Sequence, residues 1–295
     1  MQLRHYAGFG GVTLAAAVGG EPTRPPVILL HGGGQTRHAW ARAARELVAE
    51  GYYVICPDAR GHGDSGWAAD GNYRLDAFCA DLRAIIATLE QRPALIGASL
   101  GGGTALLTVG ESSEPIATAL VLVDMVPRPD PVGVSNIVRF MGANPQGFAS
   151  LDEAADAVAA YNPHRPRTRD HSGLMKNLRL RADGRLYWHW DPTFLAPDHR
   201  LDPREYQERM DAATRRVRRV RLPTLLVRGA MSDIVTEEAA AELRRMIPGC
   251  EVVNVAGAGH MVAGDRNDVF NAAIRGFLAR HSQSATLPSA VQLPG

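Results

Sequence analysis

The chain has 295 residues, which is enough for one large α/β domain or two small ones with a sizeable buried core. Hydrophobic residues make up 45% and charged residues 21%, as in ordinary globular proteins, and the formal net charge is +1. This balance gives no sign of a nucleic-acid or membrane partner, and no apolar run approaches the roughly 20 residues that span a bilayer.

The first apolar run covers residues 12–18 and follows Arg4 and His5, an order that superficially resembles a secretory signal. The run is short, alanine-rich and followed by two glycines, so an opening β-strand and turn is the better interpretation. The three cysteines are Cys56, Cys79 and Cys250. They lack metal-ligand spacing and fit buried free thiols in a reducing compartment, so we expect a cytoplasmic protein.

Strands and helices alternate along most of the chain. Short apolar runs, typical of strands buried on both faces, cover residues 27–30, 53–56, 94–96, 119–123, 224–227 and 251–255. Helical periodicity covers residues 40–50, 73–89, 100–109, 237–246 and 269–280. This alternation predicts an α/β fold with a mostly parallel sheet and helices on both faces.

Residues 126–222 interrupt the alternation. Strand signals disappear there, and helical segments such as residues 151–161 and 203–219 take over. An insertion of about 95 residues is too long for a plain loop, so it predicts a helical cap over the carboxyl edge of the sheet. We expect a core formed by residues 1–125 and 223–280, and a flexible tail over residues 281–295.

One serine lies between a predicted strand and a predicted helix. Ser99 is the centre of Gly97-Ala98-Ser99-Leu100-Gly101, directly after a buried strand. Glycines on both sides allow neighbouring backbone to pack against a tight strand-to-helix turn. The turn would expose the hydroxyl beside a helix N-terminus, where negative charge is favoured.

Three further segments complete a pattern together with this turn. They are His31-Gly32-Gly33-Gly34, residues 58–65 with the sequence DARGHGDS, and Gly259-His260-Met261. Over residues 10–280 the sequence resembles the α/β-hydrolase superfamily, in particular a branch of capped serine esterases and enzymes often labelled non-haem peroxidases. The resemblance implies an eight-stranded, mostly parallel sheet with the cap inserted after the sixth strand.

The candidate base for Ser99 is His260, in a glycine-containing loop after the last strand, because a serine hydroxyl needs a base within hydrogen-bond reach. The resemblance assigns His31 and His62 structural roles. A third group must orient the imidazole. Asp233 is the preferred acid because it follows the strand where the superfamily usually places it. Asp124, at the end of another strand, is the alternative.

Backbone N–H groups are expected to stabilise the oxyanion of the tetrahedral intermediate. One belongs to Leu100, the residue after the nucleophile. By resemblance the other belongs to Gly33, with Gly34 less favoured. Neither a metal ion nor an organic cofactor is needed for this chemistry.

The cap contains an aromatic cluster, residues 186–192 with the sequence LYWHWDP, in a chain with 6% aromatic residues. The cluster would line a hydrophobic pocket, anchor the cap to the core, or do both. The residues expected to bind substrate are Gly34, Met125, Phe140, Trp188, His189, Trp190 and Met261. Met141 adds to the same wall.

These features predict a hydrolase of a small or medium, fairly apolar carboxylic ester, acting as a monomer or homodimer. A lactonase, a carbon–carbon bond hydrolase or a cofactor-free perhydrolase would use the same residues. A non-catalytic ligand receptor on this fold is a remote alternative, because the triad and both oxyanion elements are intact.

Overall fold

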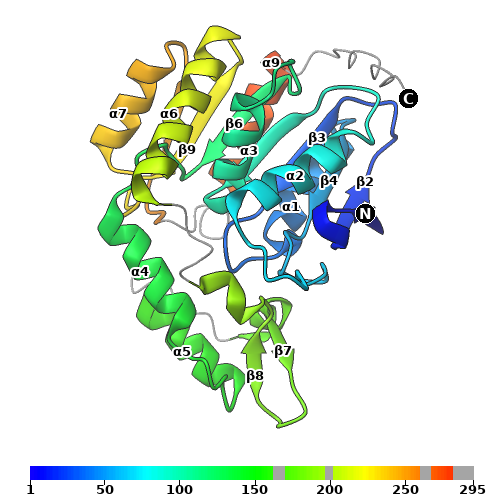
Figure 1. The fold of residues 1–295 in the computed structure, drawn as a ribbon, viewed down its shortest axis with the longest axis vertical. Helices are drawn as coiled ribbons and strands as arrows, with labels where there is room; N and C mark the ends of the chain where they lie inside the picture. The colour runs from blue at the N-terminus through cyan, green and yellow to red at the C-terminus, as the bar shows by residue number, and fades with distance from the viewer. Residues whose placement is uncertain (162–169, 197–201, 260–266, 282–295) are drawn as a thin grey trace.

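The computed structural model describes residues 1–161, 170–196, 202–259 and 267–281 (Figure 1). Its central sheet has eight strands in the order β1-β2-β4-β3-β5-β6-β9-β10. The strands are β1 (Gln2–Ala7), β2 (Thr13–Gly19), β3 (Pro26–Leu30), β4 (Tyr53–Pro57), β5 (Ala94–Ala98), β6 (Ala119–Val123), β9 (Thr224–Gly229) and β10 (Glu251–Val255). The first two are antiparallel to their neighbours and the other six are parallel to one another, which confirms the predicted fold class.

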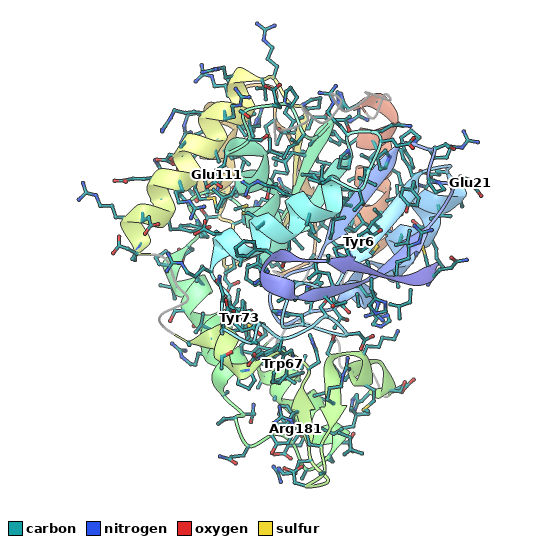
Figure 2. All side chains as sticks on the ribbon, turned by 45° about the vertical axis from the view of Figure 1, so that its right-hand side comes forward. Tyr6, Glu21, Trp67, Tyr73, Glu111 and Arg181 are labelled. Atoms are coloured by element: carbon teal, nitrogen blue, oxygen red, sulfur yellow. The ribbon has the colours of Figure 1, made fainter. Side chains whose placement is uncertain are left out.

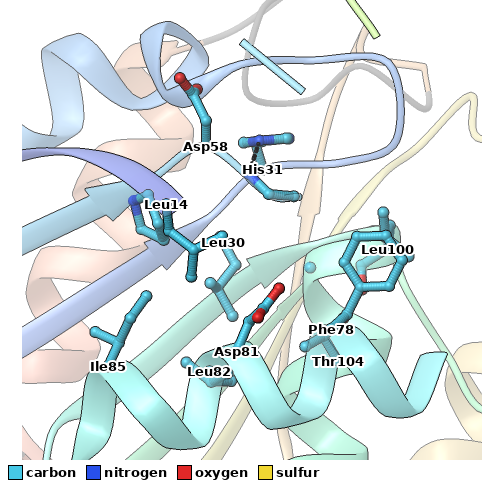
Figure 3. Close-up of a pocket in the computed structure, with 13 residues that line it drawn as sticks. Leu14, Leu30, His31, Asp58, Phe78, Asp81, Leu82, Ile85, Leu100 and Thr104 are labelled. Atoms are coloured by element: carbon cyan, nitrogen blue, oxygen red, sulfur yellow. Dashed lines mark hydrogen bonds between the residues drawn. The ribbon is translucent and has the colours of Figure 1, made fainter. Parts of the chain in front are cut away.

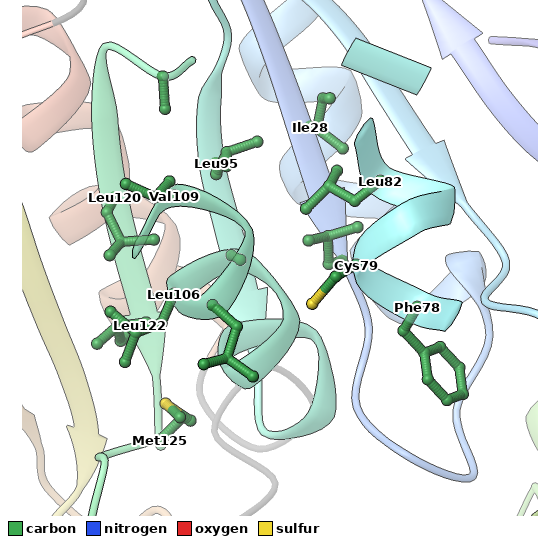
Figure 4. Packing of buried hydrophobic residues seen from close by; sticks show 14 of the residues in the cluster. Ile28, Phe78, Cys79, Leu82, Leu95, Leu106, Val109, Leu120, Leu122 and Met125 are labelled. Carbon is green, nitrogen blue, oxygen red and sulfur yellow. The ribbon is translucent and has the colours of Figure 1, made fainter. Parts of the chain in front are cut away.

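Helices cover both faces of the sheet. On one face lie α2 (Leu75–Ile86), α3 (Leu100–Gly110), α6 (Pro203–Arg219) and α7 (Glu237–Met246). The other face carries α1 (Ala41–Ala49) and α9 (Asn267–His281). Residues of β6 alternate between the two layers: Leu120 and Leu122 face α3, as Figure 4 shows, whereas Val121 faces the α1/α9 side. A strand buried on both faces has to be apolar throughout, as this one is.

The segment between β6 and β9 begins with α4 (Pro131–Gly142) and α5 (Leu151–Tyr161). It continues through η3 (Ser172–Asn177) and η4 (Pro192–Leu195), two short 3-10 helices that flank a small β-hairpin. The hairpin pairs β7 (Leu178–Leu180) with β8 (Leu186–Trp188), and Phe148 bridges to Leu186. This segment, which we call the cap, therefore contains a small hairpin besides the helices that the sequence predicted. Figure 2 shows Arg181 of this hairpin far from the sheet and Tyr73 where the hairpin side of the cap meets the core.

Helix α6 packs against α3 rather than over the edge of the sheet. Met210, Ala213 and Val217 are buried in the same apolar cluster as α3, and a Cβ on Gly110 would overlap Ala213. The division of the chain into core and cap stays a prediction, but α6, which it assigned to the cap, lies in the helix layer of the core. An amphipathic stripe such as that of α6 suits a helix of the cap as well as a helix of the core, so the sequence alone did not distinguish the two locations.

The three cysteines are buried free thiols, as expected. In the ranges that the structure describes, no helix is both long and apolar enough to cross a membrane. The predicted tail lies outside the described residues except for His281, which ends α9.

Candidate active site

Ser99 occupies a strained turn between β5 and α3. Its φ is 46° and its ψ −112°, a left-handed conformation that a non-glycine residue adopts only when its surroundings enforce it. The Ser99 N–H donates to the carbonyl of Val123 (3.1 Å), and its own carbonyl accepts from Gly103 (2.9 Å). A Cβ on Gly101 would lie 2.5 Å from the Leu30 carbonyl oxygen, so no larger residue fits there. The turn therefore has the strand–serine–helix geometry that the motif predicts.

The glycine loop after β3 passes beside the serine. A Cβ on Gly32 would lie 3.4 Å from the Cβ of Ser99. The Gly32 N–H donates to Gln35 Oε1 (3.0 Å), and the Gly34 N–H donates to His62 Nε2 (3.1 Å). Within the described ranges, the Gly33 N–H has no acceptor. Of the two glycines considered for the oxyanion, Gly33 is thus the one whose N–H is available.

Two core histidines hold this loop. The ring of His31 accepts from the Ala59 N–H at Nε2 (2.9 Å) and donates from Nδ1 to the carbonyl of Gly32 (2.8 Å). The ring of His62 accepts from Gly34 and donates from Nδ1 to the carbonyl of Arg60 (3.0 Å). Burial lowers the pKa of both, that of His62 to about 3, so both rings are neutral and can accept from backbone N–H groups.

The two candidate acids differ in their surroundings. Asp124 follows β6, has a φ of 45° and is 1% exposed. Its Oδ1 accepts from the Gly229 N–H (3.0 Å) and its Oδ2 from the Ser232 hydroxyl (2.5 Å). Asp233 is exposed, and its carboxylate makes no hydrogen bond or ion pair with any residue that the structure describes.

Tyr161, at the end of α5, is a residue of this region that the sequence did not single out. Its ring stacks on Phe140, with centroids 4.3 Å apart. Burial, together with the nearby charges of Asp233 and Asp124, raises its pKa to about 12, so the phenol stays protonated. It ends a predicted helix without any motif around it, so no sequence signal indicated its position.

The cap contacts the glycine loop through apolar side chains. A Cβ on Gly34 would lie 3.1 Å from both the Trp190 ring and the Met141 methyl group. A Cβ on Gly33 would lie 3.7 Å from the ring of Phe194, which also went unnoticed in the sequence. Phe194 follows the aromatic cluster by two residues, a weak signal that could have found it.

Two further predicted substrate-binding residues, Trp188 and Phe140, pack beside this contact. Trp188 stacks on Trp190, with centroids 5.1 Å apart, and packs edge-on against Phe140 (5.8 Å). Met125, after β6, lies against Gly102 of α3. His260 and Met261 lie outside the described residues, so their contacts are not described.

A small internal cavity of about 40 Å³ lies behind Leu100, beneath the glycine loop (Figure 3). Its walls are mostly apolar and include Leu30, Leu82 and Ile85, and the polar side chains of His31 and Asp81 also line it. Across the described portions of the chain, no group of three or more His, Cys, Asp or Glu side chains is arranged to hold a metal ion.

The sequence profile of the alpha/beta hydrolase fold matches residues 25–266. A 3-hydroxybutyrate-oligomer hydrolase of Cupriavidus necator is 29% identical over 251 residues, covering 82% of this chain and 84% of that protein. An esterase of Mycobacterium tuberculosis is 29% identical over 261 residues, covering 86% and 83%. A non-heme chloroperoxidase of Burkholderia pyrrocinia is 27% identical over 277 residues, covering 88% and 93%.

Solved structures agree on the fold. An alpha/beta hydrolase from Novosphingobium aromaticivorans superposes with a TM-score of 0.79 at 27% identity, over 95% of this chain and 98% of that one. E-2-(acetamidomethylene)succinate hydrolase superposes with a TM-score of 0.81 at 23% identity, over 94% of this chain and 99% of that one. At this level of identity the likeness shows the fold alone. The chain therefore belongs to the alpha/beta hydrolase fold family and is a hydrolase of that fold.

Proposed function

We propose that the protein cleaves a small or medium, fairly apolar carboxylic ester through an acyl-enzyme at Ser99. The observation that carries the proposal is the placement of Ser99 in a left-handed turn against the glycine loop, where a Cβ on Gly32 would lie 3.4 Å from that of Ser99. The next residue of this loop, Gly33, is the proposed source of one oxyanion donor. The second donor is the N–H of Leu100, which directly follows the nucleophile as the first residue of α3. Two donors beside a nucleophile are what a tetrahedral oxyanion requires.

The reaction proceeds in two steps. The Ser99 oxygen attacks the ester carbonyl while its proton passes to His260, and the carbonyl oxygen takes the negative charge between Gly33 and Leu100. The intermediate collapses, the carbon–oxygen bond to the alcohol breaks, and His260 returns the proton to the departing alkoxide. Water then attacks the acyl-enzyme with His260 again as base, which releases the carboxylic acid and restores the serine.

For the acid that orients His260, the geometry favours Asp124 over Asp233. Val123 and Ala98 are partners in the parallel register, so Asp124 and Ser99 end neighbouring strands at the same edge of the sheet. Asp124 is buried and held by two donors, yet each carboxylate oxygen has a further lone pair to accept from an imidazole. The Ser232 hydroxyl, from the stretch that suggested Asp233 in the sequence, donates to Asp124.

The apolar side chains around the glycine loop support an uncharged ester. Trp190, Met141 and Phe194 contact this loop from the cap. The relatives whose names denote esterases or ester-cleaving hydrolases agree with this substrate class. The similarity to a chloroperoxidase favours one second candidate, perhydrolysis, in which hydrogen peroxide replaces water as the acceptor of the same acyl group.

Hydrolysis of a short-chain p-nitrophenyl ester by wild type and Ser99→Ala tests the proposal. We expect turnover by wild type and a loss of at least about 10³-fold in the variant, because the nucleophile is removed. A fluorophosphonate should label wild type at Ser99 and leave the variant unlabelled. If the folded wild type neither turns over the ester nor reacts with the label, the protein does not use this mechanism, and a ligand-receptor function is favoured instead.

A further inference from the structure

The cap holds the glycine loop by more than apolar contact. Residues 188–191 of the cap run alongside residues 61–63, a core turn from the DARGHGDS segment that contains His62. The Asp191 N–H donates to the carbonyl of Gly61 (2.9 Å). The Tyr73 hydroxyl donates to Asp191 Oδ2 (2.6 Å), which ties the same cap residue to the segment just before α2. We call residues 61–63 the bridging turn, because it lies between the cap and the glycine loop.

A cap histidine makes the second contact with the bridging turn. The Gly63 N–H donates to His189 Nδ1 (2.6 Å), and the His189 side chain is 2% exposed. Its ring centroid lies 5.7 Å from that of His62, and the ring of Trp190 packs edge-on against it at 5.6 Å. Burial lowers the pKa of His189 to about 2, so its ring is neutral and accepts at Nδ1.

The other nitrogen of His189 is buried. With Nδ1 as an acceptor, the ring proton resides on Nε2, which has no hydrogen-bond partner among the described residues. A buried donor without a hydrogen bond is costly unless the surrounding packing fixes its position.

These contacts form a continuous path from the cap to the oxyanion site. His189 accepts from Gly63 of the bridging turn, and His62 of that turn accepts from the Gly34 N–H. That bond fixes the Gly33–Gly34 peptide, which adjoins the peptide that carries the Gly33 N–H. The imidazoles connect segments that are more than a hundred residues apart in the chain.

We propose that His189 is a positioning residue for the oxyanion hole, acting through the bridging turn, so that the hole is complete only when the cap is seated. This inference rests on the proposed ester hydrolysis. It assigns the aromatic cluster of the cap a part in transition-state stabilisation besides lining the pocket. In this role His189 acts through the bridging turn, whereas from the sequence we expected it to bind the substrate directly.

The test compares two substrates that differ at one atom, a carboxylic ester and the matching thiono ester, whose sulfur is a poor hydrogen-bond acceptor. An oxyanion hole accelerates the oxygen ester far more than the sulfur one. His189→Phe keeps a ring against Trp190 but removes the acceptor for Gly63. His189→Asn retains an acceptor near the position of Nδ1. The matched control is His171→Leu, which replaces another cap histidine, one that pairs with Asp152.

We expect His189→Phe to lower kcat for the oxygen ester by about 10- to 100-fold, less than the loss of a whole oxyanion donor, with KM within about twofold. The ratio of oxygen-ester to thiono-ester kcat should fall in the same proportion. His189→Asn should recover most of both, and His171→Leu should change neither. Equal losses on the two esters, a change confined to KM, or an Asn variant as impaired as Phe would overturn the inference.

Tyr73→Phe keeps the inference testable if His189→Phe does not fold. It removes the hydroxyl that donates to Asp191 and leaves His189 intact, so the ester ratio should fall in the same direction by a smaller factor. An unchanged ratio in a folded Tyr73→Phe protein would count against the path. Failure of wild type to hydrolyse the oxygen ester would instead reject the proposed function, so the two failures are distinguishable.

Discussion

Ser99 and Asp124 share a backbone conformation that few side chains adopt. Their φ angles are 46° and 45°, and each follows the last residue of a parallel strand. Each N–H continues the sheet by donating to the neighbouring strand, Ser99 to Val123 and Asp124 to Val227. Such left-handed conformations cost about 1–3 kcal/mol per residue and persist where the surrounding structure enforces them. The same distortion at adjacent strand ends directs two polar side chains to one edge of the sheet.

The position of Asp124 beside Ser99 predicts which of the two candidate acids, Asp124 or Asp233, is more important for activity. Asp124→Asn should lower kcat/KM by about 10³- to 10⁴-fold, because an amide cannot stabilise the imidazolium of His260. Asp233→Asn should change kcat/KM by less than about threefold, since its carboxylate is exposed. Ester hydrolysis by both variants, with thermal unfolding to verify that each is folded, gives the comparison. The reverse ranking would restore Asp233, the acid expected from the sequence.

At the scale of elements, sequence periodicity predicted those helices whose apolar residues form one continuous buried stripe. The predicted bounds of α5 and α7 coincide with the observed ones, because each helix is regular and amphipathic. The hairpin of β7 and β8 was missed because its strands have three residues each, which leaves no long alternating pattern. The strand β1 was also missed, because its residues are mostly exposed and so form no buried apolar face.

The site was predictable where a residue belongs to a local motif. Ser99 and Gly33 are placed by glycine patterns that a turn requires, and both lie where the motifs indicate. Phe194 and Tyr161 reach the same region only through the path of the cap, which no local pattern encodes. The preference between Asp124 and Asp233 depends on burial and on neighbouring donors, which are tertiary properties.

The contact between α3 and α6 gives a stability prediction. A Cβ on Gly110 would overlap Ala213, so Gly110→Ala should push α6 away from α3 and destabilise the protein by about 1–3 kcal/mol. Gly276→Ala in α9 is the matched control, because its nearest neighbour would be Arg280 at 3.6 Å. In that open position alanine should stabilise by about 0.5–1 kcal/mol through helix propensity. Urea unfolding of both variants checks the opposite signs, and two changes of the same sign would contradict the packing argument.

At the scale of the whole molecule, polar groups are buried where the cap, the bridging turn and the glycine loop meet. Arg60 forms a bidentate pair with Asp81 (2.6 and 2.7 Å) that anchors the segment before the turn to α2. Arg37 pairs with Asp58 and also contacts Asp64, which in turn pairs with Arg179 of the cap hairpin. The Arg60–Asp81 and Arg37–Asp58 pairs are buried, so removing one partner of either would leave an uncompensated charge and destabilise the junction.

Three neutral imidazoles in this junction determine how stability should vary with pH. Burial is the largest cause of the lowered pKa of His31, His62 and His189, and the values for the last two are about 3 and about 2. In the unfolded chain a histidine has a pKa of about 6.5, so between that pH and the folded values the unfolded state binds more protons. Their contribution to stability is therefore complete above pH ~6.5 and decreases as the pH falls, by up to about 1.4 kcal/mol per pH unit for each ring.

Denaturant unfolding between pH 7 and pH 4.5 measures this slope directly. Carboxylates also titrate toward the acid end of the range, so the informative quantity is the difference between variants. His189→Asn removes one such group and should reduce the slope by about one proton. If His189→Asn has the slope of wild type, the cap imidazole is not held neutral by the fold. The hydrogen bond from Gly63 would then fail to explain how the cap is seated.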